Sequence, residues 1–284
     1  MAYYCCYLFS AIGLTLHKDK DMWANGDSYE YYVGRWSRLL AHQFLAWLDI
    51  PSGAQWLDVG CGTGALSQTI FDNASPHSVL GIDSSEEYIA FARKQIKDPR
   101  AAFQLGCAQA LPVESAAYDV VVSGLVLNFV PQPLQALCEI IRAVRRGGTV
   151  AAYVWDYAGQ MQPIRHFWDA AVALDAAACT LDEGQRFPLS QPERICQLFH
   201  TYANQIGKIE LRSIDVVTPF RDFDDFWSPF LGGQGPAPSY AASLSEERRV
   251  ALREHIRAKL PIAPDGSIHL VARAWAVRGE RKKN

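Results

Sequence analysis

The chain lacks a strong excess of either charge. Its 284 residues include 27 lysines and arginines against 30 aspartates and glutamates, a formal net charge of −3. Proteins that bind nucleic acid usually carry a basic patch or an overall basic composition. One basic run, Arg278 to Lys283, lies near the C-terminus, and we interpret it as a solvated tail. We therefore expect no nucleic-acid partner.

The sequence also has no paired cysteines and no long apolar run. Seven cysteines are scattered without CxxC spacing, which argues against a disulfide framework and a zinc site, so no metal is predicted. The apolar stretch Tyr3 to Leu16 is too short to cross a bilayer, and no basic residue precedes it as in a signal peptide. We expect a cytoplasmic protein without a membrane partner. Residues 1–28 are either an N-terminal extension, such as an over-extended start, or a flap over the core.

What the sequence does contain is a regular alternation of short apolar segments with helical ones. Strands are predicted over Gln55–Val59, Ser78–Asp83, Ala101–Leu105, Tyr118–Ser123 and Thr149–Trp155. Helices are predicted over Tyr29–Leu48, Ala65–Asp72, the segment ending at Ile96, and Pro131–Arg145. This order is typical of βαβ units with right-handed crossovers, and strands apolar throughout indicate helices on both faces. The fold class is therefore α/β, a doubly wound, mostly parallel, Rossmann-like sheet.

Two local signals refine these helices. Ser84, followed three residues later by Glu87, has the spacing of a capping box and predicts the start of the helix that ends at Ile96. Gly147-Gly148 follows the segment Pro131–Arg145 and predicts its end.

The pattern changes after Asp156. Further helices are predicted over Met161–Ala178, Gln191–Asn204 and Ser245–Leu260, with strands over Lys208–Val217 and Ser267–Val277. Because no repeat or low-complexity linker interrupts the chain, we expect one domain. It would comprise a core over 29–157, cap insertions over 158–205 and 219–266, and closing strands over 206–218 and 267–278. The aromatic segment Phe220 to Phe230 either walls a substrate pocket or fills core beneath the glycine-rich turn.

That turn is the segment Trp56 to Gly64, WLDVGCGTG, between a strand and a helix. Its glycines permit a sharp turn and a close ligand, which would sit at the carboxyl end of the sheet near a helix N-terminus. Asp83 ends the second strand, where a carboxylate can accept hydrogen bonds from a ribose. A dinucleotide motif also fits, since Ala65 follows Gly64. However, Asp58 suits an ammonium group and would repel a pyrophosphate.

The core resembles class I S-adenosylmethionine (SAM)-dependent methyltransferases, of the small-molecule group related to ubiquinone/menaquinone-biosynthesis enzymes (methyltransferase type 11). The matching stretches are WLDVGCGTG, VLGIDSSEEYIAFAR, LGCAQALPVESAAYDVVVSGLVLNFV and EIIRAVRRGGTVAAYVWDY. They cover the chain from about Tyr29 to Tyr157. The resemblance implies a seven-stranded sheet with an antiparallel last strand, SAM as cofactor, and helical cap insertions.

The resemblance also assigns the cofactor-binding residues. It places Asp58 at the methionine end of SAM, the loop Val59, Gly60, Cys61, Gly62, Thr63 and Gly64 around the ligand, and Asp83 at the ribose with Ser84 beside the adenine. Gly106, Cys107, Ala108 and Gln109 match the adenine segment, Ser123 begins the segment that lines the methyl-transfer channel, and Tyr29 or Arg35 would reach the methionine carboxylate. Cys107 and Gln109 replace an aspartate and a glutamate of the family. A thiol is a poor acceptor, so the exchange could cost about 1 kcal/mol of affinity unless Ala108 and Gln109 recognise the adenine.

No catalytic residue is predicted, because methyl transfer is a displacement on a sulfonium methyl that needs chiefly an oriented nucleophile. A hydroxyl acceptor would gain from a general base, for which His166 and His17 are candidates. Asn128 stands where relatives often have histidine, and it has either a substrate role or a capping one. The predicted function is methylation of a small molecule with release of S-adenosylhomocysteine. The alternatives are an NAD(P)-linked oxidoreductase and a non-catalytic SAM-binding protein.

Overall fold

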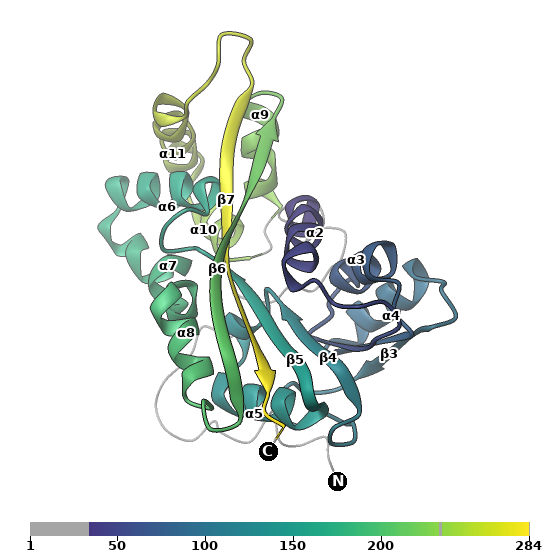
Figure 1. Cartoon of the computed structure of the whole chain (residues 1–284). Coiled ribbons are helices and arrows are strands. Elements are labelled where there is room, and N and C mark those ends of the chain that lie inside the picture. The colour runs from purple at the N-terminus through teal and green to yellow at the C-terminus, as the bar shows by residue number, and fades with distance from the viewer. Residues whose placement is uncertain (1–33, 233–234, 284) are drawn as a thin grey trace.

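A computed structural model describes residues 34–232 and 235–283 of the chain, which form a seven-stranded sheet with helices on both faces (Figure 1). The strand order is β3-β2-β1-β4-β5-β7-β6. The strands are β1 (Gln55–Val59), β2 (Ser78–Asp83), β3 (Ala101–Leu105), β4 (Tyr118–Gly124), β5 (Val144–Trp155), β6 (Ile206–Phe220) and β7 (Ile268–Arg281). Strands β1 to β5 pair in parallel, whereas β7 runs antiparallel to both β5 and β6. The predicted fold class, with its antiparallel last strand, is confirmed.

Alternate residues of the central strands enter two different hydrophobic layers. Trp56, Val120, Val122 and Tyr153 face the layer that contains α2 (Arg35–Leu48), α3 (Ala65–Ala74) and α6 (Gln162–Leu174). Leu57, Val121 and Ala152 face the opposite layer with α5 (Pro133–Ala143) and α8 (Pro192–His200). The remaining helix of the core, α4 (Glu86–Gln95), packs on β2 and β3. Burial on both faces explains why these strands are apolar nearly throughout.

The C-terminal helices gather around the long strands β6 and β7, which extend beyond the rest of the sheet (Figure 1). These helices are α7 (Glu183–Arg186), α9 (Phe223–Trp227), α10 (Pro236–Ser243) and α11 (Glu246–Lys259), with short 3-10 turns over Leu127–Phe129, Ala176–Leu181, Pro188–Ser190 and Ser228–Leu231. None of the helices within the described ranges is both long and apolar enough to cross a membrane. The division into extension, core and cap stays a prediction.

The aromatic segment Phe220 to Phe230 belongs to the core. Its five aromatic side chains are buried, and Phe230 stacks on Phe167 of α6 with ring centroids 4.7 Å apart. Phe220 lies edge-on to Trp36 of α2 at 5.3 Å. The rings therefore join α2, α6, α9 and β6. None of these side chains lines the cavity at the carboxyl ends of β1, β2, β4 and β5, so the alternative in which this segment walls a substrate pocket there is wrong.

Two of the predicted helix signals are wrong. The N-cap of α4 is Ser85, whose hydroxyl accepts the Tyr88 N–H at 3.3 Å. The chain turns one residue later than predicted because the carboxylate of Asp83 accepts the Ser85 N–H. Gly147-Gly148 does not end a helix, because α5 stops at Ala143 and both glycines lie inside β5 at a shift in its register with β4. A Cβ at Gly148 would lie 2.5 Å from the Asp119 carbonyl oxygen.

Other helices are shorter than their periodicity predicts. Helix α6 ends at Leu174 because Asp175 leaves the helix, and its carboxylate accepts the Ala177 N–H at the start of the following 3-10 turn. Helix α8 likewise covers Pro192–His200 rather than the full stretch to Asn204. Helix α2 is described from Arg35, and the predicted start at Tyr29 lies outside the described residues.

Candidate functional site

A cavity of about 310 Å³ lies at the carboxyl ends of β1, β2, β4 and β5. This volume is at the lower end of the range for small-molecule sites, roughly 300–1,000 Å³. The lining residues are Ser37 of α2; Asp58, Gly60, Cys61, Gly62, Thr63, Ala65 and Leu66 around the glycine turn; Asp83, Ser84, Ser85 and Tyr88; Gly124, Leu125, Val126 and Phe129; and Tyr153, Trp155 and Tyr157. The cavity thus occupies the position where open parallel sheets bind their ligands.

The glycine turn bends back over the sheet through three left-handed residues. The φ angles of Gly60, Gly62 and Gly64 are +75°, +52° and +87°. A Cβ at Gly60 would lie 2.5 Å from both Cγ atoms of Val126, so the turn and the loop after β4 can touch only because Gly60 has no side chain. A Cβ at Gly62 would meet no protein atom within 4 Å. The space next to Gly62 is therefore open, at a residue that lines the cavity.

Asp83 ties the glycine turn to the start of α4. One of its carboxylate oxygens accepts the Gly62 N–H at 2.9 Å, and the other accepts the Ser85 N–H at 2.9 Å. Burial raises the pKa of Asp83, although these backbone hydrogen bonds act to lower it. Because a carboxylate oxygen can accept two hydrogen bonds, the held carboxylate retains acceptor capacity toward the cavity. This geometry fits its predicted role at the ribose hydroxyls.

Asp58 is the most deeply buried carboxyl group of the cavity, with 1% of its surface exposed. Its Oδ2 accepts the Ser67 hydroxyl at 2.7 Å, whereas its Oδ1 is buried without a hydrogen-bond partner among the described residues. Burial raises the pKa of Asp58 to about 7, the Ser67 hydroxyl opposes the rise, and Asp83 adds to it. A buried acceptor without a partner is costly, so Oδ1 is well suited to receive a donor from a ligand.

Aromatic side chains line the other side of the cavity. Tyr153 and Trp155 point to the same face of β5, and Tyr157 follows them two residues later. Phe129 comes from the turn after β4 and meets Phe187 edge-on with centroids 4.9 Å apart, and Phe187 also packs against Tyr157 at 5.7 Å. One side of the cavity is therefore formed by the glycine turn with the carboxyl groups of Asp58 and Asp83, and the other side by aromatic rings.

Three of the predicted cofactor residues do not line this cavity. Val59 is fully buried in the layer of α5 and α8. Gly64 faces α4, where a Cβ would lie 2.8 Å from the Ile96 side chain. Ser123 points away because strand alternation puts Asp58 and Ser123 on opposite faces, and its hydroxyl is buried with no hydrogen-bond partner among residues 34–232 and 235–283. For Val59 and Ser123 a side-chain contact with a ligand in this cavity therefore has no geometric support.

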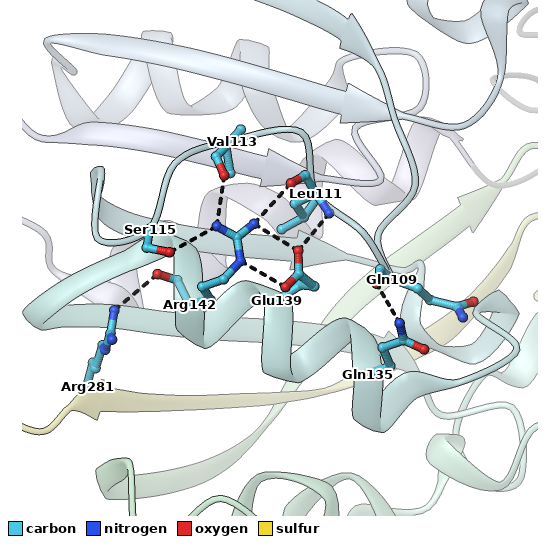
Figure 2. A network of polar contacts seen from close by, with 8 residues as sticks. All are labelled: Gln109, Leu111, Val113, Ser115, Gln135, Glu139, Arg142 and Arg281. Atoms are coloured by element: carbon cyan, nitrogen blue, oxygen red, sulfur yellow. Dashed lines mark hydrogen bonds and ion pairs between the residues drawn. The ribbon is translucent and has the colours of Figure 1, made fainter. Parts of the chain in front are cut away.

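The predicted adenine segment, Gly106 to Gln109, also lies outside the lining of the cavity. It is held next to it, because the Gly106 N–H donates to the Asp83 carbonyl at 2.8 Å. Figure 2 shows how the following loop is fixed to α5: Arg142 donates to the carbonyls of Leu111 and Val113 and pairs with Glu139 at 2.8 Å. The binding of adenine by Gly106, Cys107, Ala108 and Gln109 stays a prediction.

The candidate catalytic residues do not reach the cavity either. His166 lies half-buried on α6, where burial lowers the pKa of its imidazole, and it does not line the cavity. Asn128 is not a lining residue, although its neighbour Phe129 is, and the Asn128 Oδ1 is buried without a hydrogen-bond partner within the described ranges. Tyr29, His17 and the side chain of Arg35 lie outside the described part of the chain.

Several lining residues were not predicted from the sequence. They are Ser37, Ala65, Leu66, Ser85, Tyr88, Tyr153, Trp155 and Tyr157, whereas Gly124, Leu125, Val126 and Phe129 lie in residues 123–130, the segment that the resemblance predicted to line the methyl-transfer channel. Alternation along β5 could have indicated Tyr153, Trp155 and Tyr157, since their spacing of two puts them on one face at the carboxyl end of a parallel strand. No comparable signal marks Ser37, whose helix precedes the sheet.

Residues 57–152 match the family of methyltransferase domains. Over 110 residues, 36% of this chain and 46% of the relative, the sequence is 34% identical to the demethylmenaquinone methyltransferase of Shouchella clausii. The first curated relatives are matched over only 30–46% of their own lengths. The phosphoethanolamine N-methyltransferase 2 of Haemonchus contortus, solved with phosphomonomethylethanolamine and S-adenosylhomocysteine, superposes with a TM-score of 0.56 at 16% identity, covering 90% of this chain and 57% of that one.

The cyclase SpnF is also similar in fold, with a TM-score of 0.50 at 15% identity over 88% of this chain and 82% of that one. Likeness at such identities shows the fold alone. The family match over residues 57–152 confirms the predicted resemblance of this segment to class I SAM-dependent methyltransferases. The segment that matches the family includes the glycine turn, Asp83 and the loop after β4, and therefore most of the acidic side of the cavity.

Proposed function

We propose that the protein is a methyltransferase that transfers the methyl group of SAM to a small, uncharged acceptor with an aromatic or apolar body. The observation that carries this proposal is the two-sided cavity at the glycine turn. Buried Asp58 and half-buried Asp83 stand on one side, and Phe129, Trp155 and Tyr157 stand on the other. The matched methyltransferase family supports the same reaction class.

The described residues fit SAM in three respects. The partnerless Oδ1 of Asp58 is an acceptor for the ammonium group of its methionine part. The held carboxylate of Asp83 can accept from ribose hydroxyls. The open space over Gly62, beside the N-terminus of α3, admits the ligand against the turn backbone.

Methyl transfer uses the lone pair of the acceptor to form a bond to the methyl carbon, while the electron pair of the carbon–sulfur bond stays on the sulfur of S-adenosylhomocysteine. The contribution of the protein is to hold the two reactants in line and to keep water away. The glycine turn with Asp58 and Asp83 would hold the donor. The rings of Phe129, Trp155 and Tyr157 would hold the acceptor. No general base is assigned, because no histidine is found among the described lining residues, and the proton of a hydroxyl or amine acceptor would leave to solvent.

The charge of the cavity guides the choice of acceptor. Among the described lining residues two are carboxylic acids and none is lysine, arginine or histidine. An anionic acceptor would be repelled by the acids without a compensating cation. Aromatic side chains instead favour a flat or apolar body through offset or edge-on ring contacts. Small-molecule acceptors are also the substrates named for several of the matched relatives.

Cofactor binding and turnover test the proposal separately. Thermal unfolding with SAM, S-adenosylhomocysteine, NADH and NADPH should show a rise in melting temperature with the first two only. Labelled methyl transfer from SAM into a panel of phenols, quinols and aromatic amines should then show turnover. Stabilisation by NADH or NADPH alone would favour an oxidoreductase. Stabilisation by SAM without turnover on any acceptor, including a cell extract, would favour a binding protein.

A further inference from the structure

Ser67 is the third residue of α3 and is completely buried. It does not line the cavity, and nothing in the glycine motif marks it as functional. Its hydroxyl donates to the Oδ2 of Asp58 at 2.7 Å, nine residues back along the chain. This is the one hydrogen bond to the Asp58 carboxylate from another side chain in the described part of the structure.

The two oxygens of Asp58 are therefore unequal. Oδ2 accepts a hydrogen bond from Ser67, while Oδ1 is buried, has no hydrogen-bond partner in the described part of the chain, and belongs to a residue that lines the cavity. A carboxylate that rotated freely could present either oxygen. Ser67 fixes which oxygen faces α3 and which remains for a ligand.

We propose that Ser67 is a positioning residue for Asp58: its hydroxyl holds Oδ2 so that Oδ1 accepts the ammonium group of the bound amino-acid part. This inference rests on the proposed binding of SAM. It adds a residue that the glycine motif does not contain and that acts only through Asp58.

A consequence is that the ammonium group of the ligand binds the ionised form of the Asp58 carboxyl group. The titratable groups that share its cavity are Cys61 on the glycine turn, Asp83 at the end of β2, Tyr88 on α4, and Tyr153 and Tyr157 from β5 and the residues after it. None of these groups is cationic, and the Asp83 charge raises the pKa of Asp58 further. With a pKa of about 7, Asp58 is largely protonated below neutral pH. The ligand must then displace that proton, so affinity should fall as the pH falls.

The test measures dissociation constants by calorimetry for S-adenosylhomocysteine and for 5′-methylthioadenosine, which has the adenosine part but no amino-acid part. For the wild-type protein, the affinity for S-adenosylhomocysteine should fall more than tenfold from pH 7.5 to pH 5.5, whereas that for 5′-methylthioadenosine should change less than twofold. Ser67→Ala should weaken S-adenosylhomocysteine about tenfold at pH 7.5 and leave 5′-methylthioadenosine unchanged.

The matched control is Thr69→Ala. Thr69 is a buried hydroxyl two residues further along α3, but it donates to the Ala65 carbonyl at 2.8 Å and does not touch Asp58. It should leave both dissociation constants unchanged. If Ser67→Ala acted only by loosening α3, it would weaken both ligands alike, and the positioning role would be wrong.

A second readout does not depend on any ligand. Carbon-13 NMR titration of the Asp58 carboxyl in the ligand-free protein should place its pKa higher in Ser67→Ala than in the wild type, because the hydroxyl that lowers it is gone. An unchanged pKa, or equal affinity of Ser67→Ala and wild type for S-adenosylhomocysteine, overturns the proposal. If the wild type binds neither ligand, the proposed function fails instead, and the NMR titration still decides whether Ser67 controls Asp58.

Discussion

The N-terminal and C-terminal regions of the chain each bury a carboxylic acid, and the two acids are held differently. Asp58 is the residue before the end of β1, lines the cavity, and has one carboxylate oxygen without a hydrogen-bond partner among the described residues. Glu183 lies in α7, only 2% exposed, and accepts the indole N–H of buried Trp168. Burial raises the pKa of Asp58 to about 7 and that of Glu183 to about 8.

The difference separates a binding acid from a structural one. Asp58 has an unsatisfied oxygen that a ligand can occupy, so its burial costs stability that binding can offset. Glu183 does not line the cavity and has its partner within the protein. A perturbed pKa is therefore no guide to function by itself. The partnerless oxygen and the cavity distinguish the two groups.

Gly60→Ala should give the largest loss of stability, because it disrupts the backbone of the glycine turn that lines the cavity. The new Cβ would combine a left-handed φ of +75° with a 2.5 Å contact to Val126. We expect a loss of about 4 kcal/mol in the free energy of unfolding, measured by urea titration. Gly62→Ala is the matched control: its Cβ meets no protein atom within 4 Å, so only backbone strain of about 1 kcal/mol is expected. Equal losses in the two variants would contradict this description of the turn.

Glu183→Gln tests the structural acid. A pKa raised above the unfolded value means that the folded state holds a proton that the unfolded chain has released. The associated stability is fully present below about pH 4 and is lost as the pH rises through about 8. The amide mimics the neutral acid, so the variant should exceed the wild type by on the order of 3 kcal/mol at pH 8 and match it near pH 4. SAM affinity should not change.

Asp58→Asn should differ from Glu183→Gln in its effect on cofactor affinity. It also removes a buried acid and should raise the melting temperature of the ligand-free protein above pH 7, but it should weaken S-adenosylhomocysteine strongly. If Asp58→Asn left that affinity intact, or Glu183→Gln reduced it, the distinction between the two acids would fail.

Arg142→Lys should have a moderate effect on the loop that follows the predicted adenine segment. A lysine keeps the charge but cannot make the forked contacts to Leu111, Val113 and Glu139 (Figure 2). We expect a loss of about 2 kcal/mol in the free energy of unfolding by urea titration. Arg145→Lys, on the more exposed pair with Asp119, should cost less than about 0.5 kcal/mol. A cost for Arg142→Lys as small as that of Arg145→Lys would mean that the loop needs no such anchor.

His166→Ala should have the smallest effect on catalysis. Because His166 does not line the cavity, kcat for methyl transfer should stay within about twofold of the wild type across pH 6 to 9. Phe129→Ala, which opens the aromatic side of the cavity, should raise KM for the acceptor in the same assay. A pH-dependent loss of kcat in His166→Ala would restore His166 as a general base and move part of the chemistry into the C-terminal region.

The sequence predicts the structure of the N-terminal region well. Strands β1, β2 and β3 have the predicted bounds, because each is a short apolar run bounded by turn residues. Asp58 and the turn could be found because one strand and one loop fix their spacing along the chain, and Asp83 could be found because it ends the next strand. The same reasoning failed for Ser123, where strand alternation turns the side chain away.

The structure of the C-terminal region was much less predictable from the sequence. Glu183 lies in the segment Asp182-Glu183-Gly184-Gln185-Arg186, which has the composition of an exposed turn. Its burial depends on Trp168, fifteen residues earlier, and no local pattern records such a contact. The aromatic segment from Phe220 to Phe230 was equally ambiguous, because core and pocket use the same side chains. Tertiary packing determines both the burial of Glu183 and the place of the aromatic segment in the core.

The most direct test of the account is a calorimetric titration of the wild-type protein and Asp58→Asn with S-adenosylhomocysteine at pH 7.5. The account predicts saturable binding at one site per chain for the wild type and at least tenfold weaker binding for the folded variant. No heat with the wild-type protein, or equal affinity in both proteins, would contradict a cofactor site built on Asp58.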